Sequence, residues 1–392
     1  MGKLHQLGRA RPTHGSDVML PVAEPILGEE EKAALCEVVD GGWITMGDRV
    51  RVFEQEFAAE HNLADAVAVS SCTAALHLIL QSLGIGPGDE VLVPSLTFVA
   101  TVNCVLYAGA SPVFVDIEGL DWPVISLTDA AAKCTARTRA VILMHYAGYV
   151  AEREAWRYFA RSRGLLLIED AAHAAGAEQV GTFGNAAAFS FYGNKNMTTA
   201  EGGVVTSPDR SVFENVRQMR NHGMTSGTFQ RFSNQTVGYD VTMLGYNYRM
   251  DDLRAAIGLT QLRKLKIWND KRRTLTQLYM DCLKERCPAL GLPFGERKEP
   301  PPPSAHHIMP VVLPEDADRQ KVIDALRDVG IQTSNHYPAA HRLSFYRDRF
   351  PSVRLPQTEE YARRQLTLPL HPRMDASHVD RVATVLTTAL MH

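Results

Sequence analysis

The sequence lacks the features that would place it among membrane or nucleic-acid-binding proteins. Its longest wholly apolar runs are short, such as residues 140–144, whereas a membrane helix needs about 20 apolar residues. Neither charge is in excess, because 41 Lys and Arg residues face 44 Asp and Glu residues. The N-terminus has no apolar segment of the kind that directs secretion. We therefore expect no membrane segment, no nucleic-acid partner and a cytoplasmic location.

Cysteine is scarce and scattered. The six cysteines form no CxxC pair and no metal-finger spacing: Cys36, Cys72, Cys104, Cys134, Cys282 and Cys287. We expect reduced thiols and no metal site. The adjacent His306 and His307 precede a predicted strand, on which neighbouring side chains point to opposite faces. They are therefore not expected to share a metal ion.

Alternating strand and helix signals run from about residue 65 to residue 207. The predicted strands are nearly continuous apolar runs, at 66–69, 90–94, 112–117, 140–145, 165–170, 187–192 and 204–206. Helical spacing falls between them, at 72–84, 98–108 and 151–163. This alternation predicts an α/β fold with a mostly parallel central sheet flanked by helices on both faces.

The second half of the chain predicts a smaller C-terminal α/β domain. A long helical stretch covers residues 252–286, and four consecutive prolines follow at 300–303. A predicted strand at 308–313 and a helix at 319–329 come next. We expect a flexible N-terminal tail over 1–20, a large domain over 21–265 and a small domain over 266–392.

Three features of the large domain could carry chemistry. Residues 70–75 are small and hydroxylic and precede a predicted helix, so their backbone N–H groups could bind a phosphate, although no glycine-rich fingerprint is present. Asp170 ends a buried strand, and Lys195 follows the next one. Taken singly, each has a plain alternative: a helix cap, a solvated loop carboxylate and a surface lysine.

Taken together, the three features describe one kind of site. Ligands of open α/β sheets bind beyond the carboxyl ends of the strands, where all three are expected. A phosphate cradle, a carboxylate for a protonated pyridine nitrogen and a lysine for a Schiff base are the parts of a pyridoxal 5'-phosphate (PLP) site. We therefore predict PLP as the cofactor.

Ordered motifs over about residues 20–390 strengthen this interpretation. They are GGWITMG (41–47), SSCTAALHL (70–78), PSLTFVAT (94–101), HYAG (145–148), IEDAAHAAGA (168–177), SFYGNKNMTTAEGG (190–203), RNHGM (220–224), LGYNYRMDDLRAAIG (244–258) and LPLHP (368–372). With these motifs the chain resembles the sugar-nucleotide aminotransferases of the DegT/DnrJ/StrS type. The resemblance implies the PLP-dependent transferase fold of type I, the fold of aspartate aminotransferase.

The resemblance also implies the catalytic residues. Lys195 would hold the cofactor aldehyde as a Schiff base, and Asp170 would pair with the pyridine N–H. His173 occupies the position that hydrogen-bonds the ring hydroxyl oxygen, and we expect it one helical turn after Asp170, on the same side of the site.

Further cofactor contacts are implied by the same motifs. Phe98 would stack on the ring, the backbone N–H groups of Thr73 and Ala74 and the hydroxyl of Ser190 would bind the phosphate, and Asn247 with Arg249 would reach the phosphate from a second subunit. No strand end between 221 and 243 is expected to return the chain to its own crevice. The resemblance therefore implies a homodimer with shared active sites.

The implied reaction moves an amino group from an amino acid, with glutamate suggested as donor, to a nucleotide-linked keto sugar through a pyridoxamine phosphate intermediate. Two alternatives remain open: an aminotransferase for a keto cyclitol or related antibiotic precursor, and a non-catalytic regulator that binds PLP or a sugar nucleotide. A related branch that dehydrates sugars has His at the lysine position, and Lys195 argues against it.

Overall fold

The structure is a computed structural model that describes residues 19–391 except 228, 230–231, 233–237 and 296–301. Most of the predicted N-terminal tail, and Pro300 and Pro301 of the predicted proline connector, lie outside the described residues. No helix in the described part of the chain combines the length and apolarity needed to cross a bilayer.

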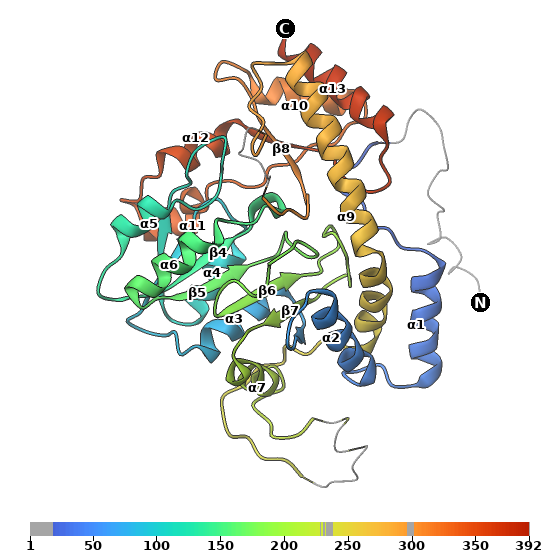
Figure 1. The fold of residues 1–392 in the computed structure, drawn as a ribbon, viewed down its shortest axis with the longest axis vertical. Helices are drawn as coiled ribbons and strands as arrows, with labels where there is room; N and C mark the ends of the chain where they lie inside the picture. Colours follow the sequence, from blue (N-terminus) through green and yellow to red (C-terminus); the bar gives the residue numbers. More distant parts are fainter. Residues whose placement is uncertain (1–18, 228, 230–231, 233–237, 296–301, 392) are drawn as a thin grey trace, which may run out of the picture.

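A mostly parallel sheet forms the centre of the large domain (Figure 1). Its strand order in the described part of the chain is β1-β7-β6-β5-β4-β2-β3. Only β7 runs antiparallel to its neighbours, β1 and β6. The strands are β1 Val67–Val69, β2 Glu90–Pro94, β3 Ser111–Val115, β4 Thr138–Met144, β5 Leu166–Asp170, β6 Ala186–Ser190 and β7 Gly203–Thr206. The predicted α/β fold is confirmed, and the strand bounds fall within two residues of those expected.

Helices cover both faces of the sheet (Figure 1). The larger helices are α1 Glu29–Gly41, α2 Asp48–Glu60, α3 Cys72–Ser82, α4 Ala100–Tyr107, α5 Leu127–Lys133, α6 Arg153–Arg163, α7 Arg210–Met219 and α9 Asp252–Arg286. Successive strand residues alternate between the two cores: Ile168 of β5 packs with α3 and α4, whereas its neighbour Leu167 packs with α6. This alternation is why the strands read as continuous apolar runs.

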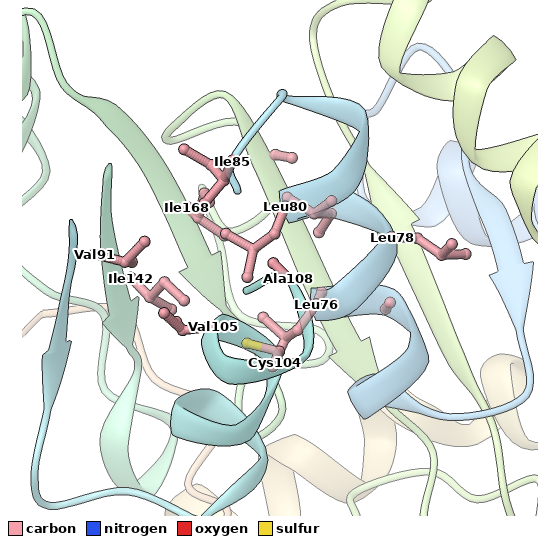
Figure 2. Packing of buried hydrophobic residues seen from close by; sticks show 14 of the residues in the cluster. Leu76, Leu78, Leu80, Ile85, Val91, Cys104, Val105, Ala108, Ile142 and Ile168 are labelled. Atoms are coloured by element: carbon pink, nitrogen blue, oxygen red, sulfur yellow. The ribbon is translucent and has the colours of Figure 1, made fainter. Parts of the chain in front are cut away.

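Helix α3 shows how the core positions the site. Leu80 points toward Ile168 of the sheet, and Leu76 lies beside Cys104 of α4 (Figure 2). The helix begins after Ser71, whose hydroxyl accepts the Ala74 N–H at 3.1 Å as an N-cap. Packing and cap together aim the N-terminus of α3 at the edge of the sheet that holds the predicted site.

The small domain has its own core around a two-stranded antiparallel sheet, β8 Met309–Val312 with β9 Gln365–Leu368. Helices α10 Arg319–Asp328 and α13 Ala376–Leu390 contribute to this core. By contrast, α11 Ser344–Arg349 packs on the core of the large domain through Tyr346, and α12 Pro356–Arg364 joins a separate cluster through Tyr361. Helix α9 continues without a break through residue 265, where we expected the domain boundary. Leu20, placed in the predicted tail, is buried in this core, and its N–H donates to the Gly330 carbonyl at 2.7 Å. The small domain is therefore built from both ends of the chain.

Candidate active site

The carboxyl ends of the parallel strands bring the predicted chemical groups to one edge of the sheet. Asp170 is the last residue of β5, and Ser190 is the last residue of β6. Lys195 follows in the loop after β6, where its N–H donates to the Tyr192 carbonyl at 3.0 Å. These are the positions from which an open α/β sheet presents side chains to a ligand.

Asp170 is a buried carboxylate whose two oxygens can accept more hydrogen bonds than the described residues donate. Its Oδ2 accepts the Thr101 hydroxyl at 2.6 Å, and its Oδ1 accepts the Ala172 N–H at 3.1 Å. Burial raises the pKa of Asp170, while these two hydrogen bonds oppose the shift. A carboxylate in such a position is costly unless a cation faces it, so the remaining lone pairs suit a protonated ring nitrogen.

Lys195 lies close enough to Asp170 for their charges to interact, and it is partly buried. Burial lowers the pKa of Lys195 from 10.5 to about 8, although the charge of Asp170 opposes the shift. A lysine with a pKa of about 8 is neutral in about a tenth of molecules at pH 7, a far larger fraction than for an ordinary lysine with a pKa of 10.5. A neutral amine is the form that attacks an aldehyde.

His173 is buried, and its Nε2 lies 2.8 Å from the hydroxyl of Tyr337. Burial holds the pKa of His173 well below its ordinary value, so the ring is neutral. Its Nδ1 is buried without a partner among the described residues. The expected helical turn between Asp170 and His173 is wrong, because residues 171–175 form consecutive turns. The turns still bring His173 to the same edge of the sheet.

Phe98 is one of the exposed residues among the predicted cofactor contacts. It lies in the loop between β2 and α4 and is 56% exposed. Its ring centroid lies 6.1 Å from that of Tyr337, which contacts His173. An exposed aromatic ring next to Tyr337, which itself contacts His173, is available to stack on a planar ligand.

The predicted phosphate end lies at the N-terminus of α3. The Ala74 N–H is already engaged by the cap residue Ser71, while Thr73 is partly buried one position earlier. A Cβ at Gly203 would lie 2.7 Å from the Cys72 nitrogen, so only glycine lets β7 pass this close to the helix end. Ser190 is buried nearby at the end of β6. The arrangement is a helix N-terminus with hydroxyls around it, which favours an anion.

Asn247 and Arg249 lie on a segment that returns to the edge of the sheet. Arg249 pairs with Val69 of β1 through an isolated bridge, and the Ser70 N–H donates to the Tyr248 carbonyl at 2.8 Å. The part of 221–243 that the structure describes holds no named strand, as expected, but the chain returns to the sheet just beyond it, where edge strand β1 satisfies its backbone groups. Arg249 donates to Asn221 at 3.0 Å, whereas Asn247 is exposed.

Four polar residues at the site carry no role in the sequence-based prediction. Thr101 lies within the PSLTFVAT motif, so its place after a predicted strand was a usable signal. Tyr337 and His307 come from the small domain and reach His173 across more than 130 residues, and Asn196 adjoins Lys195. No local pattern announces such contacts.

Comparison with known proteins agrees with this geometry. The model of the DegT/DnrJ/EryC1/StrS aminotransferase family matches residues 25–387. Among solved structures, the chain is similar to Helicobacter pylori PseC, an aminotransferase involved in the biosynthesis of pseudoaminic acid, with 26% identity, a TM-score of 0.88 and coverage of 95% of this chain and 99% of that one. It is also similar to S. venezuelae DesV in complex with a ketimine intermediate, with 34% identity, a TM-score of 0.84 and coverage of 93% and 95%.

A third similar structure is DesI in the presence of its TDP-sugar product, with 28% identity, a TM-score of 0.83 and coverage of 96% of this chain and 94% of that one. The fold and the match to the family model define an aminotransferase with the fold of PLP-dependent enzymes. The chain belongs to the DegT/DnrJ/EryC1/StrS aminotransferase family, whose members depend on PLP.

The side chains at the site fit that cofactor. Asp170 has lone pairs for a protonated ring nitrogen, and the unpartnered Nδ1 of His173 can meet a ring oxygen. Lys195 supplies an amine of lowered pKa. The N-terminus of α3 supplies a place for a phosphate.

Proposed function

We propose that the chain is a PLP-dependent aminotransferase that moves the amino group of an amino acid, glutamate in the first instance, to a keto sugar linked to a nucleotide. The observation that carries this proposal is the convergence of Asp170, Lys195 and His173 at one edge of the sheet. PLP supplies an electron-withdrawing ring that stabilises negative charge on the carbon next to the amine.

Each of these residues has a distinct task in the proposal. Lys195 would hold the cofactor through its aldehyde, and its amine, when free, would be placed to move a proton at the donor carbon. Asp170 keeps the ring nitrogen protonated. His173 is neutral because of burial, and it donates or accepts at the ring oxygen through Nδ1.

The remaining predicted residues orient the cofactor. Phe98 covers one face of the ring, and the N–H groups of Thr73 and Ala74, with the hydroxyl of Ser190, hold the phosphate. Since Ser71 occupies the Ala74 N–H, phosphate binding at Ala74 requires this cap to be shared or exchanged. DesI was solved with a TDP-sugar product, which supports a nucleotide-linked sugar as acceptor rather than a free one.

Covalent trapping tests the cofactor assignment. Purified protein incubated with PLP should absorb visible light, and borohydride should fix the cofactor on Lys195, as read by peptide mass spectrometry. Lys195→Ala should abolish both signals and transamination, while Lys266→Ala, in the middle of α9, serves as the matched lysine control. Cofactor trapped on another lysine would refute the assignment.

A homodimer with shared sites completes the proposal. The segment after α7 extends away from the sheet (Figure 1) and carries the exposed Val241 and Leu244, and the exposed Asn247 lies where the chain comes back to the sheet. Exposed apolar side chains of this kind mark association surfaces. Mixing inactive Lys195→Ala and Asn247→Asp proteins should restore activity, since one site of the heterodimer then has both native groups. A monomer by sedimentation, or no recovery in a confirmed heterodimer, would contradict shared sites.

A further inference from the structure

His307 is buried against His173, a residue of the proposed cofactor site, although the sequence suggested no role for it. Its ring is 3% exposed and packs on the ring of His173 with centroids 4.2 Å apart. The close approach depends on Gly148, whose φ is +92° and where a Cβ would lie 2.9 Å from the His173 carbonyl and 3.2 Å from the His307 nitrogen. The small-domain segment is thus pressed directly onto the large-domain site.

The hydrogen bonds of two side-chain amides, Asn269 and Asn196, determine which ring nitrogen of His307 carries the hydrogen. Backbone carbonyls, which can only accept hydrogen bonds, fix the orientation of both amides. Asn269 places one amide atom 2.9 Å from the Ala175 carbonyl, so that atom is the nitrogen and the other is an acceptor. Asn196 places one amide atom 2.7 Å from this acceptor and 2.7 Å from the Ala305 carbonyl, so that atom is also a nitrogen. The Asn196 oxygen must then face His307.

The tautomer of His307 follows directly. Its Nδ1 lies 2.8 Å from the Asn196 oxygen and therefore carries the hydrogen. Its Nε2 keeps a lone pair, and this nitrogen is buried without a partner among the described residues. Burial and the nearby His173 and Lys195 hold the pKa of His307 well below its ordinary value, so the ring stays neutral. The Nε2 of His307 can therefore only accept a hydrogen bond, and none of the described residues donates one to it.

We propose that His307 is a further binding residue of the active site, whose Nε2 accepts a hydrogen bond from the primary amine that enters the site, and that Asn196 is the positioning residue that holds it in this tautomer. The inference rests on the proposed function, which brings an amine to Lys195. Leaving a buried acceptor unpaired is costly, so an N–H donor from the substrate lowers the free energy of the complex. A phosphate or carboxylate oxygen cannot fill this role, because it has no hydrogen to donate.

The neighbouring His306 provides a matched control. Its ring packs edge-on against Tyr149, at a centroid distance of 5.6 Å, rather than on His173. The pKa of His306 is lowered by burial and by Arg273 and Arg272, with no contribution from Lys195. Its φ of +47° is a conformation that Asn tolerates. His306→Asn therefore changes an adjacent histidine and spares the proposed contact.

The tautomer is tested in the cofactor-free protein. Nitrogen-15 NMR of histidine-labelled protein should show His307, assigned by its loss in His307→Phe, with a protonated Nδ1 and a bare Nε2 at pH 7. Asn196→Leu should abolish this preference. A protonated Nε2 in the wild-type protein would overturn the proposal. This measurement does not depend on PLP, and the deciding result comes from the wild-type protein.

The amine contact is tested in the PLP-loaded protein. α-Methylglutamate, which has no α-hydrogen to lose, is mixed with the protein in a stopped-flow instrument, and the concentration dependence of the initial rate of absorbance change gives the affinity for the amine before it reacts. His307→Phe should bind PLP as the wild type does but bind this amine about tenfold more weakly, the effect of about one lost hydrogen bond. His307→Gln should recover part of the affinity, and His306→Asn should match the wild type. Equal amine affinity in His307→Phe and wild type would refute the contact, whereas failure of the wild type to bind PLP would refute the proposed function itself.

Discussion

Two consecutive residues of β5, Glu169 and Asp170, are both buried carboxylates, but they have opposite surroundings. Glu169 accepts the N–H groups of Gly181, Phe183 and Gly184 and the Nε2–H of His145, at distances of 2.9 to 3.3 Å. Asp170, on the other face of the sheet, accepts one hydroxyl and one backbone N–H.

The difference separates a structural carboxylate from a chemical one. His145 accepts the Ala151 N–H at its Nδ1, so its proton lies on Nε2 and points at Glu169. Every direction around Glu169 is thus occupied by a protein donor, and the residue pins the loop 181–184 against the sheet. Asp170 keeps lone pairs for a group that the protein does not supply. Burial alone does not identify a functional residue, whereas unused hydrogen-bonding capacity does.

The largest expected effect comes from removing the charge that faces the site. Asp170→Asn should fold and bind PLP, yet lose about 10²–10³ in kcat, because an amide does not hold the ring nitrogen protonated. Steady-state kinetics with saturating cofactor measure this loss. A kcat close to that of the wild type would remove Asp170 from the reaction and erase the contrast with Glu169.

The same change on the other face should affect stability instead. Glu169→Gln places an NH₂ group against backbone donors and should lower the free energy of unfolding by about 3 kcal/mol. Urea denaturation measures the loss, and turnover by the folded fraction should stay near the wild-type value. A variant of unchanged stability but low turnover would reverse the roles assigned to the two carboxylates.

A pH profile tests the environment of Lys195, whose charge interacts with that of Asp170. Because burial lowers the pKa of Lys195 to about 8, the neutral amine is lost as the pH falls below 8. The rate of PLP capture by the cofactor-free protein should therefore drop about tenfold per pH unit below 8 and level off above it. Stopped-flow absorbance follows the reaction, and a profile still rising at pH 10 would show an ordinary, exposed lysine.

The smallest expected effect comes from making Asp170 still less satisfied. Thr101→Val removes the hydroxyl that donates to Oδ2 at 2.6 Å, at a cost of about 1.5 kcal/mol for a hydrogen bond to a charged group. PLP affinity should change less than in Asp170→Asn, and Thr101→Ser should restore the wild-type behaviour. An equal defect in the Ser variant would mean that the methyl group matters rather than the hydroxyl.

Asp170 and Lys195 were accessible to sequence reasoning because each follows a buried apolar run, and a parallel sheet gathers such strand ends. The structural role of Glu169 could not be predicted from the same run, because the sequence does not show which face of the sheet a single polar residue in it occupies. The contacts of Tyr337 and His307 with His173 could not be predicted, because they join residues far apart in the chain and produce no periodic pattern in the sequence. The domain boundary at residue 265 was placed inside a helix that the sequence itself predicts over 252–286, and the structure shows that this helix is unbroken.

Helix α9 has a consequence for how the protein comes apart. At 35 residues it is about 52 Å long. Leu259 and Leu262 belong to the core of the large domain, and Tyr279 and Leu283 belong to that of the small one. Unfolding of either core would expose the apolar residues on half of this helix while the other half stayed packed. Each core therefore stabilises the helical conformation that the other core needs. The two domains are therefore coupled in unfolding. Cutting the chain at residue 265 would break a continuous helix that belongs to both cores, not a flexible linker.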